Sequence, residues 1–272
     1  MTAANQSRPN SAARGFSLIE MMIVIVVISI VVAAVLAQVN VTQQRAIAEQ
    51  SKLDQFQTAR NFVDQISIDA RQMGFPNTHN FDVSAAAIPA WPAGLAGLQS
   101  DARIAVGLVK LTTNSIQFEG DVNGSGNVSE VSYAINGDGL CATCLERAQV
   151  TKVNGVAPLA QAPAAGTYSA EIQNVQNANS AANPIFKAFK MDGTQIALPI
   201  DINANAALVA QVRVIQVSLD VSDPNQLDPR TRQPLEANIT SRVQVVNCSM
   251  AGSAAGLGIP QVAGSVQLAC QP

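Results

Sequence analysis

A long apolar run near the N-terminus dominates the hydrophobic pattern of the chain. Within residues 16–36 the positions that are not apolar are Ser17, Glu20 and Ser29. As a helix, about 21 residues at ~1.5 Å each span about 30 Å, which is the thickness of a bilayer's hydrocarbon core. The pattern therefore predicts a membrane-spanning helix close to the start of the chain.

The polar flank before this run predicts its orientation. Residues 1–15 lack an acidic side chain and carry Arg8 and Arg14, which favours a cytoplasmic N-terminus with the remainder of the chain outside. A secretory signal peptide or a plain signal anchor is the alternative. A signal peptide, however, has a shorter apolar core followed by a small-residue cleavage site. A plain anchor has no reason to keep Glu20, because a carboxylate in an apolar span is costly unless it is paired or neutralised.

Helical periodicity continues after Gln38, where the sequence turns polar. Apolar residues recur there at spacings of three and four: Leu53, Phe56, Ala59, Val63, Ile66, Ala70 and Met73. Gly74 and Pro76 then end the pattern. We expect one helix over about 17–73, with its membrane part within 16–38 and an amphipathic extension within 39–75 that packs under a globular domain.

The rest of the chain, 76–272, has the pattern of a β-rich domain outside the membrane. Strands are expected at 104–111, 115–119, 130–135, 208–221 and 238–246, and the last two are expected to pair. Stretches rich in Pro, Ala and Asn at about 83–99, 155–184 and 250–265 predict surface loops. The predicted fold class is α+β, with the long helix packed on an antiparallel sheet.

Composition narrows the classes of function. Of the 272 residues 13% are charged and 4% aromatic, and the net charge of −3 gives no electrostatic footprint for nucleic acid. The one histidine, His79, follows the predicted helix, and no spacing of residues places paired catalytic groups around it. We therefore expect neither an enzyme nor a nucleic-acid partner.

The segment Arg14-Gly15-Phe16-Ser17-Leu18-Ile19-Glu20, followed by the apolar run, resembles the cleavage and methylation motif of type IV pilins and of type II secretion pseudopilins. In that family a prepilin peptidase cuts after the glycine and N-methylates the new N-terminus. The resemblance implies that residues 1–15 are a leader, that the cut lies between Gly15 and Phe16, and that Phe16 is methylated. Many major pilins have a proline in the middle of this helix. None stands there in this chain, which predicts a more continuous helix.

The same resemblance implies an assembly role for Glu20, the fifth residue of the mature chain. The mature N-terminus is a cation held in an apolar bundle, and Glu20 of a neighbouring subunit can offset it. Because neither buried charge is tolerated alone, their pairing would also set the axial step between subunits.

Further segments are similar to PilW-like minor pilins and J-type pseudopilins. The helix end at 62–75 combines apolar residues, a basic residue and Gly-aromatic. Downstream, the Asp-Val-Asn-Gly loop at 121–124, Glu130-Val-Ser-Tyr and Glu146-Arg147 follow in the order of that family. Major pilins are usually much shorter than this chain, which favours a minor pilin.

This resemblance implies a minor pilin of a type IV pilus, a structural subunit that helps to prime or cap assembly after processing. The alternatives are a J-type minor pseudopilin of type II secretion and a binding or adhesion subunit at the pilus tip, for which Trp91 is thin support. The implied partners are other minor and major pilins, the prepilin peptidase, the inner-membrane assembly platform and, before assembly, membrane lipid. The implied location is the inner membrane as a single-pass protein, and then the pilus or cell surface.

One loop has the spacing of a calcium site. Oxygen-bearing side chains stand at every second position, at Asp121, Asn123, Ser125 and Asn127, with glycine at the sixth position. This spacing is typical of the first half of an EF-hand calcium loop. The twelfth position is Ser132 rather than glutamate, and Glu130 is the candidate replacement. A polar hairpin turn is the alternative, and apart from calcium at this loop we expect no cofactor.

The four cysteines are Cys141, Cys144, Cys248 and Cys270. Outside the cytoplasm an even number predicts up to two disulfides, and four cysteines allow three pairings. Zinc binding or redox chemistry at Cys141-Ala-Thr-Cys144 is the alternative, but the β-rich surroundings lack the helix start that a thioredoxin-like pair needs. We expect structural disulfides, with Cys248 joined to Cys270 around a Gly/Ala-rich loop, as in many pilins.

Overall fold

The computed structural model describes residues 17–76, 94–178, 180–228 and 231–245. Its first element is α1 (Leu18–Arg71), one uninterrupted helix of 54 residues. The helix ends just before Gly74, which has a positive φ of 77°, a conformation that glycine adopts without strain. The helix predicted over about 17–73 is therefore confirmed, and so is its continuity.

The described residues of the globular head form two antiparallel sheets. The larger sheet has the order β5-β4-β3-β2-β1-β8 and the smaller one the order β10-β9-β6-β7. The larger consists of β1 (Leu108–Leu111), β2 (Ser115–Gly120), β3 (Ser129–Ile135), β4 (Leu145–Thr151), β5 (Ser169–Ile172) and β8 (Ile200–Asp201). The smaller consists of β6 (Phe186–Phe189), β7 (Gln195–Ile196), β9 (Val214–Leu227) and β10 (Pro234–Gln244). The described part of the head also contains three short helical segments: α2 (Gly94–Gln99), η2 (Pro158–Gln161) and α3 (Ala206–Val209).

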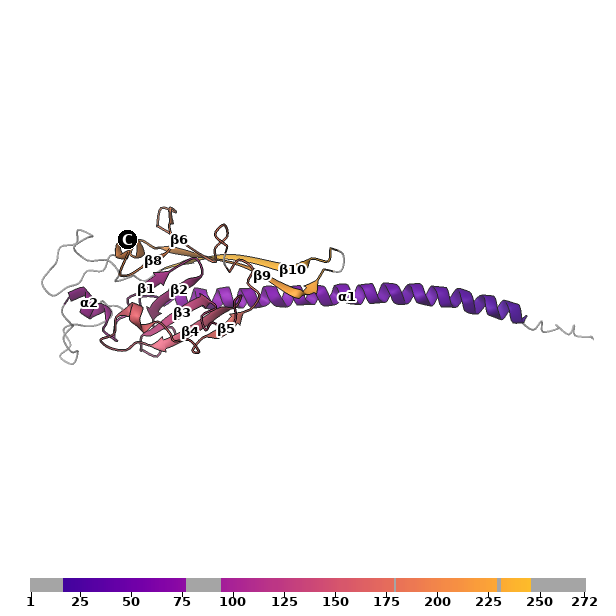
Figure 1. Ribbon diagram of the computed structural model, residues 1–272, viewed down its shortest axis with the longest axis horizontal. Helices are drawn as coiled ribbons and strands as arrows, with labels where there is room; N and C mark the ends of the chain where they lie inside the picture. Colours follow the sequence, from indigo (N-terminus) through magenta and orange to yellow (C-terminus); the bar gives the residue numbers. More distant parts are fainter. Residues whose placement is uncertain (1–16, 77–93, 179, 229–230, 246–272) are drawn as a thin grey trace, which may run out of the picture.

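The C-terminal part of α1 lies in the core of the head, while its N-terminal part projects far beyond it (Figure 1). Strands β9 and β10 run along the helix, and β5 contacts it as well. The apolar side chains of α1 that are buried within the head are Ala59, Phe62, Val63, Ile66 and Ala70. They share one apolar cluster with residues of both sheets. The amphipathic extension thus packs under the head as predicted, and the fold is α+β.

The end of α1 is hydrogen-bonded to the C-terminal end of β2. Gly74 donates its backbone N–H to the carbonyl of Glu119 at 2.9 Å, and Met73 forms an antiparallel bridge with Gly120. A Cβ at Gly120 would collide with the carbonyl of Gln72. Glycine is therefore required at this position because the helix end approaches the strand so closely.

The segment that follows β5 links the two sheets. Val175 pairs with Val221 of β9 in an isolated bridge. Gln176 donates its N–H to the carbonyl of Asp220 at 2.7 Å, and Ser222 donates to the carbonyl of Asn174 at 3.1 Å. The larger sheet is thereby tied to the smaller one through main-chain hydrogen bonds.

Several strand predictions are confirmed and others need correction. β2 and β3 lie where expected, and β9 pairs with β10 along most of their length. The strand predicted at 104–111 is wrong before Leu108, because Ala105 and Val106 donate their N–H groups to Pro76 and to the side chain of Glu119 instead. The strand predicted at 208–221 begins only at Val214, since its first residues continue the short helix α3.

The predicted single sheet is in fact two, and the region 155–184 is not purely loop. It contains η2 and strand β5, which pairs with β4. The other predicted loop regions lie wholly or largely outside the described residues, apart from 94–99, which form α2.

Candidate functional site

The N-terminal half of α1 presents an apolar surface that the described residues of the chain do not cover. From Leu18 onward the first buried residue of the helix is Ala48. Within the described residues, α1 is the one helix long and apolar enough to cross a membrane. An exposed apolar surface of this length needs lipid or a protein partner around it.

Glu20 is the one ionisable side chain in the apolar run and lies in the first turn of α1. The side chain is exposed, and within the described residues no hydrogen bond or ion pair engages it. Its location in the first turn is favourable, because the free N–H groups of a helix start attract negative charge. Gly15 and Phe16, the predicted cleavage site, lie outside the described residues.

This geometry can be compared with known families. Residues 10–36 match the prokaryotic N-terminal methylation motif. The match supports a type IV pilin-like or pseudopilin-like precursor, which implies processing by a prepilin peptidase and pilin partners in general. It is a structural rather than an enzymatic family, and single-pass membrane anchoring through α1 is consistent with it. Among curated proteins and solved structures, nothing matches the chain.

In the head, a buried polar cluster attaches α1 to the larger sheet. Asp69, in the last turns of α1, is 1% exposed. Its Oδ2 atom accepts a hydrogen bond from the Tyr133 hydroxyl at 2.6 Å and from Arg147 Nε at 2.9 Å. The guanidinium group also forms an ion pair with this carboxylate at 2.9 Å. Phe62 lies about two turns before Asp69 on the same face of α1, and its ring packs edge-on against the Tyr133 ring with centroids 5.4 Å apart.

The electrostatics of this cluster favour the charged pair and a neutral phenol. Burial, together with the charge of Asp69, raises the pKa of Tyr133 above its ordinary value. The phenol therefore keeps its proton and remains a donor to the carboxylate. Because Arg147 neutralises Asp69, the helix can carry a carboxylate into the core without leaving a buried charge unpaired.

A second buried pair fastens the loop after α2 to the larger sheet. Lys152 Nζ lies 2.6 Å from Glu119 Oε2, and neither side chain has exposed surface. The ammonium group also donates to the carbonyls of Gln99 and Ile104, at 2.7 Å and 2.9 Å, so that all three of its protons are used. Burial raises the pKa of Glu119 and lowers that of Lys152, while their mutual attraction opposes both shifts.

Glu130 is a third buried ionisable side chain, next to the Glu119–Lys152 pair. It stands directly opposite Glu119 in the β2–β3 pairing and is fully buried. Gln117 donates its side-chain N–H to Glu130 Oε1. Burial, and then the charge of Glu119, raise the pKa of Glu130 to about 8, so the group is mostly protonated at neutral pH. Within the described residues Glu119 Oε1 and Glu130 Oε2 have no hydrogen-bond partner. A protonated Glu130 adds an O–H donor to this site, whereas the three N–H donors of Lys152 are already in use.

The predicted calcium loop forms the turn between β2 and β3. The Asp121 carboxylate accepts the backbone N–H of Ser125 at 3.0 Å and that of the next glycine at 2.8 Å. Asn123 Oδ1 also accepts from Ser125, and Asn127 donates its N–H to the Ser125 hydroxyl. Glu130, the proposed closing ligand, is directed into the buried pocket described above. These contacts support the alternative of a polar turn, and calcium binding stays a prediction.

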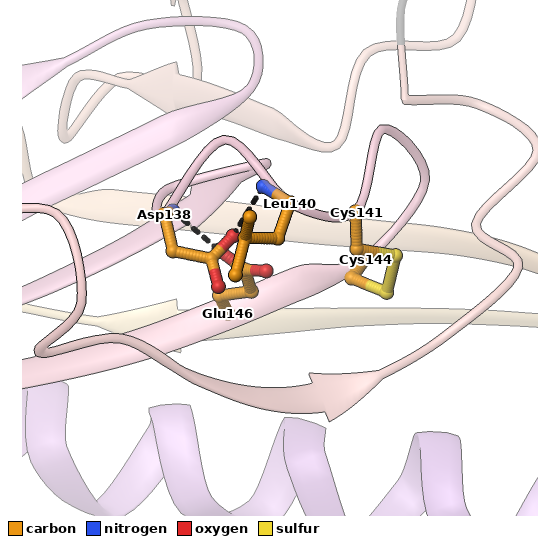
Figure 2. Close-up of a disulfide and its surroundings, with 5 residues drawn as sticks. All are labelled: Asp138, Leu140, Cys141, Cys144 and Glu146. Carbon is orange, nitrogen blue, oxygen red and sulfur yellow. Dashed lines mark hydrogen bonds between the residues drawn. A yellow bond between two sulfur atoms is a disulfide. The ribbon is translucent and has the colours of Figure 1, made fainter.

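Cys141 and Cys144 form a disulfide in the connection between β3 and β4 (Figure 2). Cys144 accepts the N–H of Asn136 through its carbonyl at 3.0 Å, and Thr143 accepts that of Val175 at 2.9 Å. The disulfide loop is thus bonded to the segment that joins the two sheets. Cys248 and Cys270 lie outside the described residues, so the disulfide between them stays a prediction. His79 and Trp91 also lie outside the described residues.

The same connection presents an exposed apolar side chain. Leu140 is 87% exposed and directly precedes the disulfide. Asp138 Oδ1 accepts the Leu140 N–H at 2.7 Å, and Glu146 Oε2 accepts the Asp138 N–H at 2.8 Å (Figure 2). The loop is therefore held in one conformation while its apolar tip remains available for a contact.

The roles of Asp69, Tyr133 and Arg147 were not predicted from the sequence. One signal was present, because Asp69 adjoins the apolar stripe at Ala70 and an acidic residue on a buried face needs a cation. Its partner, however, stands 78 residues away, and no local spacing identifies it.

Proposed function

We propose that this chain is a minor pilin of a type IV pilus, a structural subunit that primes or caps assembly after prepilin peptidase removes its leader. The observation that carries the proposal is the coincidence of the methylation motif, which includes Glu20, with a continuous helix whose apolar N-terminal half is not covered by the described residues of the head. The length of the chain favours a minor rather than a major pilin.

The proposed mechanism begins in the membrane. There α1 spans the bilayer, with its N-terminus cytoplasmic and its head outside. On assembly the apolar half exchanges lipid for the helices of neighbouring subunits, so the large exposed side chains remain out of water. Glu20 then offsets the N-terminal amine of N-methyl-Phe16 in a neighbour, which fixes the axial position of one helix against the next.

The axial position of α1 also fixes the position of the head in the fibre only if the head is attached rigidly to the helix. Three buried attachments support that requirement: the Asp69 cluster, the close approach of Gly120 to the helix end, and the apolar stripe around Val63. Because the attachments lie at the C-terminal end of α1, the free half of the helix stays accessible to partners.

A J-type minor pseudopilin of type II secretion would share every one of these features. The two functions are separated by deleting the gene in the organism that makes the protein. A minor pilin predicts fewer surface fibres with protein secretion unchanged, and the chain itself in the sheared fibre fraction. Normal fibres together with impaired protein secretion would instead assign the chain to the secretion system.

A further inference from the structure

Lys152 and Glu119 meet in a site that is closed to bulk water. Lys152 Nζ lies 2.6 Å from Glu119 Oε2, and neither side chain has exposed surface. The carboxyl carbon of Glu119 is one bond of about 1.2 Å beyond that oxygen, so it lies at most about 3.8 Å from the nitrogen. Atoms that react with each other start from a separation of about 3–3.5 Å. A primary amine is therefore held close to reaction distance from a carboxyl carbon.

The surrounding contacts orient both groups for the formation of an amide. Lys152 Nζ donates two of its protons to the carbonyls of Gln99 and Ile104 and directs the third at Glu119. When that third proton passes to the carboxylate, the nitrogen lone pair faces the carboxyl group, and a desolvated lysine amine is a nucleophile. Val106 donates its backbone N–H to Glu119 Oε2 at 2.9 Å, where it can stabilise negative charge that develops on this oxygen.

The other oxygen of Glu119 has the surroundings of a leaving group. Within the described residues Glu119 Oε1 accepts no hydrogen bond, and Glu130 Oε2 also has no partner. The two side chains stand directly opposite each other in the β2–β3 pairing, where Cβ atoms lie about 4.5–5.5 Å apart. Gln117 occupies the second oxygen of Glu130. A hydrogen-bond donor at position 130, either the O–H of an acid or the N–H of an amide, can therefore reach Oε1 and assist its departure.

We propose that Lys152 and Glu119 condense to form an intramolecular amide bond, a covalent modification inside the larger sheet. Nζ forms a bond to Cδ of Glu119, and the bond from Cδ to Oε1 breaks. Two of the three ammonium protons leave with Oε1 as one molecule of water, and the third stays on the amide nitrogen. Oε2 becomes the amide carbonyl oxygen and keeps its hydrogen bond from Val106. The reaction uses no oxidant or reductant, and the exclusion of bulk water slows hydrolysis of the product.

Two other pairs of a cation and a carboxylate in the described part of the head lack this combination of features. Arg147 and Asp69 are in contact, but a guanidinium group stays protonated and is not a nucleophile. Lys110 stands opposite Asp201 in the β1–β8 pairing, but its side chain is exposed to water. Neither pair is expected to condense.

The bond would join β2 to the residue that follows β4, across the intervening strand β3. It would close residues 119–152 into a ring that contains the Cys141–Cys144 disulfide. Because Gly74 at the end of α1 donates to the carbonyl of Glu119, the helix would be attached to a covalently closed part of the sheet. The bond does not depend on whether the chain is assembled in a pilus or in a secretion system.

Trypsin mapping of the full-length chain, purified in detergent with its cysteines reduced and alkylated, tests for the bond. In an unlinked chain trypsin cuts after Lys152 and releases residues 111–147 and 148–152 as separate peptides. Trypsin does not cut after an acylated lysine, so the linked chain should yield residues 111–147 joined to 148–187. This branched species should be lighter than the two peptides together by one water molecule. Tandem mass spectrometry should locate the branch at Glu119 and Lys152.

Lys152→Arg is the matched variant, because it keeps the positive charge but removes the nucleophile. Its intact mass, corrected for the change of side chain, should exceed that of the wild type by one water molecule. Any leader removal or methylation cancels when both chains come from the same cells. Lys110→Arg, which removes an exposed lysine, should leave the water loss unchanged.

The proposal is overturned if residues 111–147 and 148–152 of the wild type are recovered as separate peptides at full mass. A water loss that tandem mass spectrometry locates at any other pair of residues would overturn it as well. The wild-type map alone decides between these results, so the test holds even where Lys152→Arg does not fold.

Discussion

Glu130 contributes a proton-dependent term to the stability of the head. Its carboxyl has an ordinary pKa of 4.5, and burial raises that pKa to about 8 in the folded protein. Between these values the folded state holds a proton that the unfolded chain has released, so stability falls as the pH rises. The contribution is fully present below about pH 4.5, and its loss levels off above about pH 8.

Glu130→Gln should remove this pH dependence. The amide has nearly the shape of the protonated acid, carries no charge, and has an N–H donor where the acid has its O–H. We expect the free energy of unfolding, measured by urea titration in detergent, to be a few kcal/mol higher than that of the wild type at pH 8 and similar at pH 4.5. Glu171→Gln, on an exposed side chain, should follow the wild-type profile. Parallel pH profiles for wild type and Glu130→Gln would show that Glu130 is not protonated in the fold.

Arg147→Ala should destabilise the head strongly. The change leaves the buried Asp69 carboxylate with hydrogen bonds from the Tyr133 hydroxyl and the Gln65 amide but without a cation, and a half-broken buried ion pair costs about 3–5 kcal/mol. Arg60→Ala is the control, because Arg60 and Asp64 form an exposed pair on the same helix. That control should change stability little. If both variants unfold at the same temperature, the Asp69 cluster does not attach the helix to the head.

At the scale of elements, the disulfide loop should stabilise the junction of the two sheets. Replacing Cys141 and Cys144 together with serine opens a very short loop, for which chain entropy predicts a loss of about 2 kcal/mol. The melting temperature should fall by roughly 4–8 °C. Hydrogen exchange should also increase at Val175, which donates to the loop. Unchanged exchange at Val175 would mean that the disulfide stabilises the loop alone.

Elements with a strong pattern of their own could be predicted from the sequence. The helix α1 follows from its apolar run and stripe, and the β9–β10 pair follows from long alternation. The strands β5, β7 and β8 contain four residues or fewer and are defined by their pairing partners, so their own sequences carry little signal. The division into two sheets likewise depends on β9 pairing with β6 and β10 rather than with a strand of the larger sheet. The pairing of β9 with β6 joins segments that are distant in the sequence, so no local pattern predicts it.

The candidate sites divide in the same way. Glu20 stands out locally, because a carboxylate in an apolar run is conspicuous. The cluster of Asp69, Tyr133 and Arg147 joins three distant elements, and only the folded chain brings its members together.

For the whole molecule, Glu20→Ala should separate folding from assembly. Glu20 lies at the far end of α1 from the head, so the head should unfold at the wild-type temperature. In the fibre, the N-terminal amine of a neighbour would lose its partner, a cost of several kcal/mol. We expect the variant to be cleaved and inserted in the membrane but recovered poorly with sheared fibres and partner pilins. A subunit at the very tip would escape part of this loss, having no subunit ahead of it. Wild-type recovery in both fractions would show that Glu20 is not an assembly contact.

Processing at the predicted junction is the most direct test of the claim that this chain is a pilin-like subunit. The measurement is the mass and sequence of the N-terminal peptide of the protein recovered with sheared fibres, beside a variant with Gly15 replaced by a bulky residue. We predict a mature chain that begins with N-methyl-Phe16, and uncut precursor held in the membrane for the variant, because the peptidase must fit a small residue at the cut. A mature chain that begins at Met1, or after the apolar run, would contradict the account, as would normal processing of the Gly15 variant.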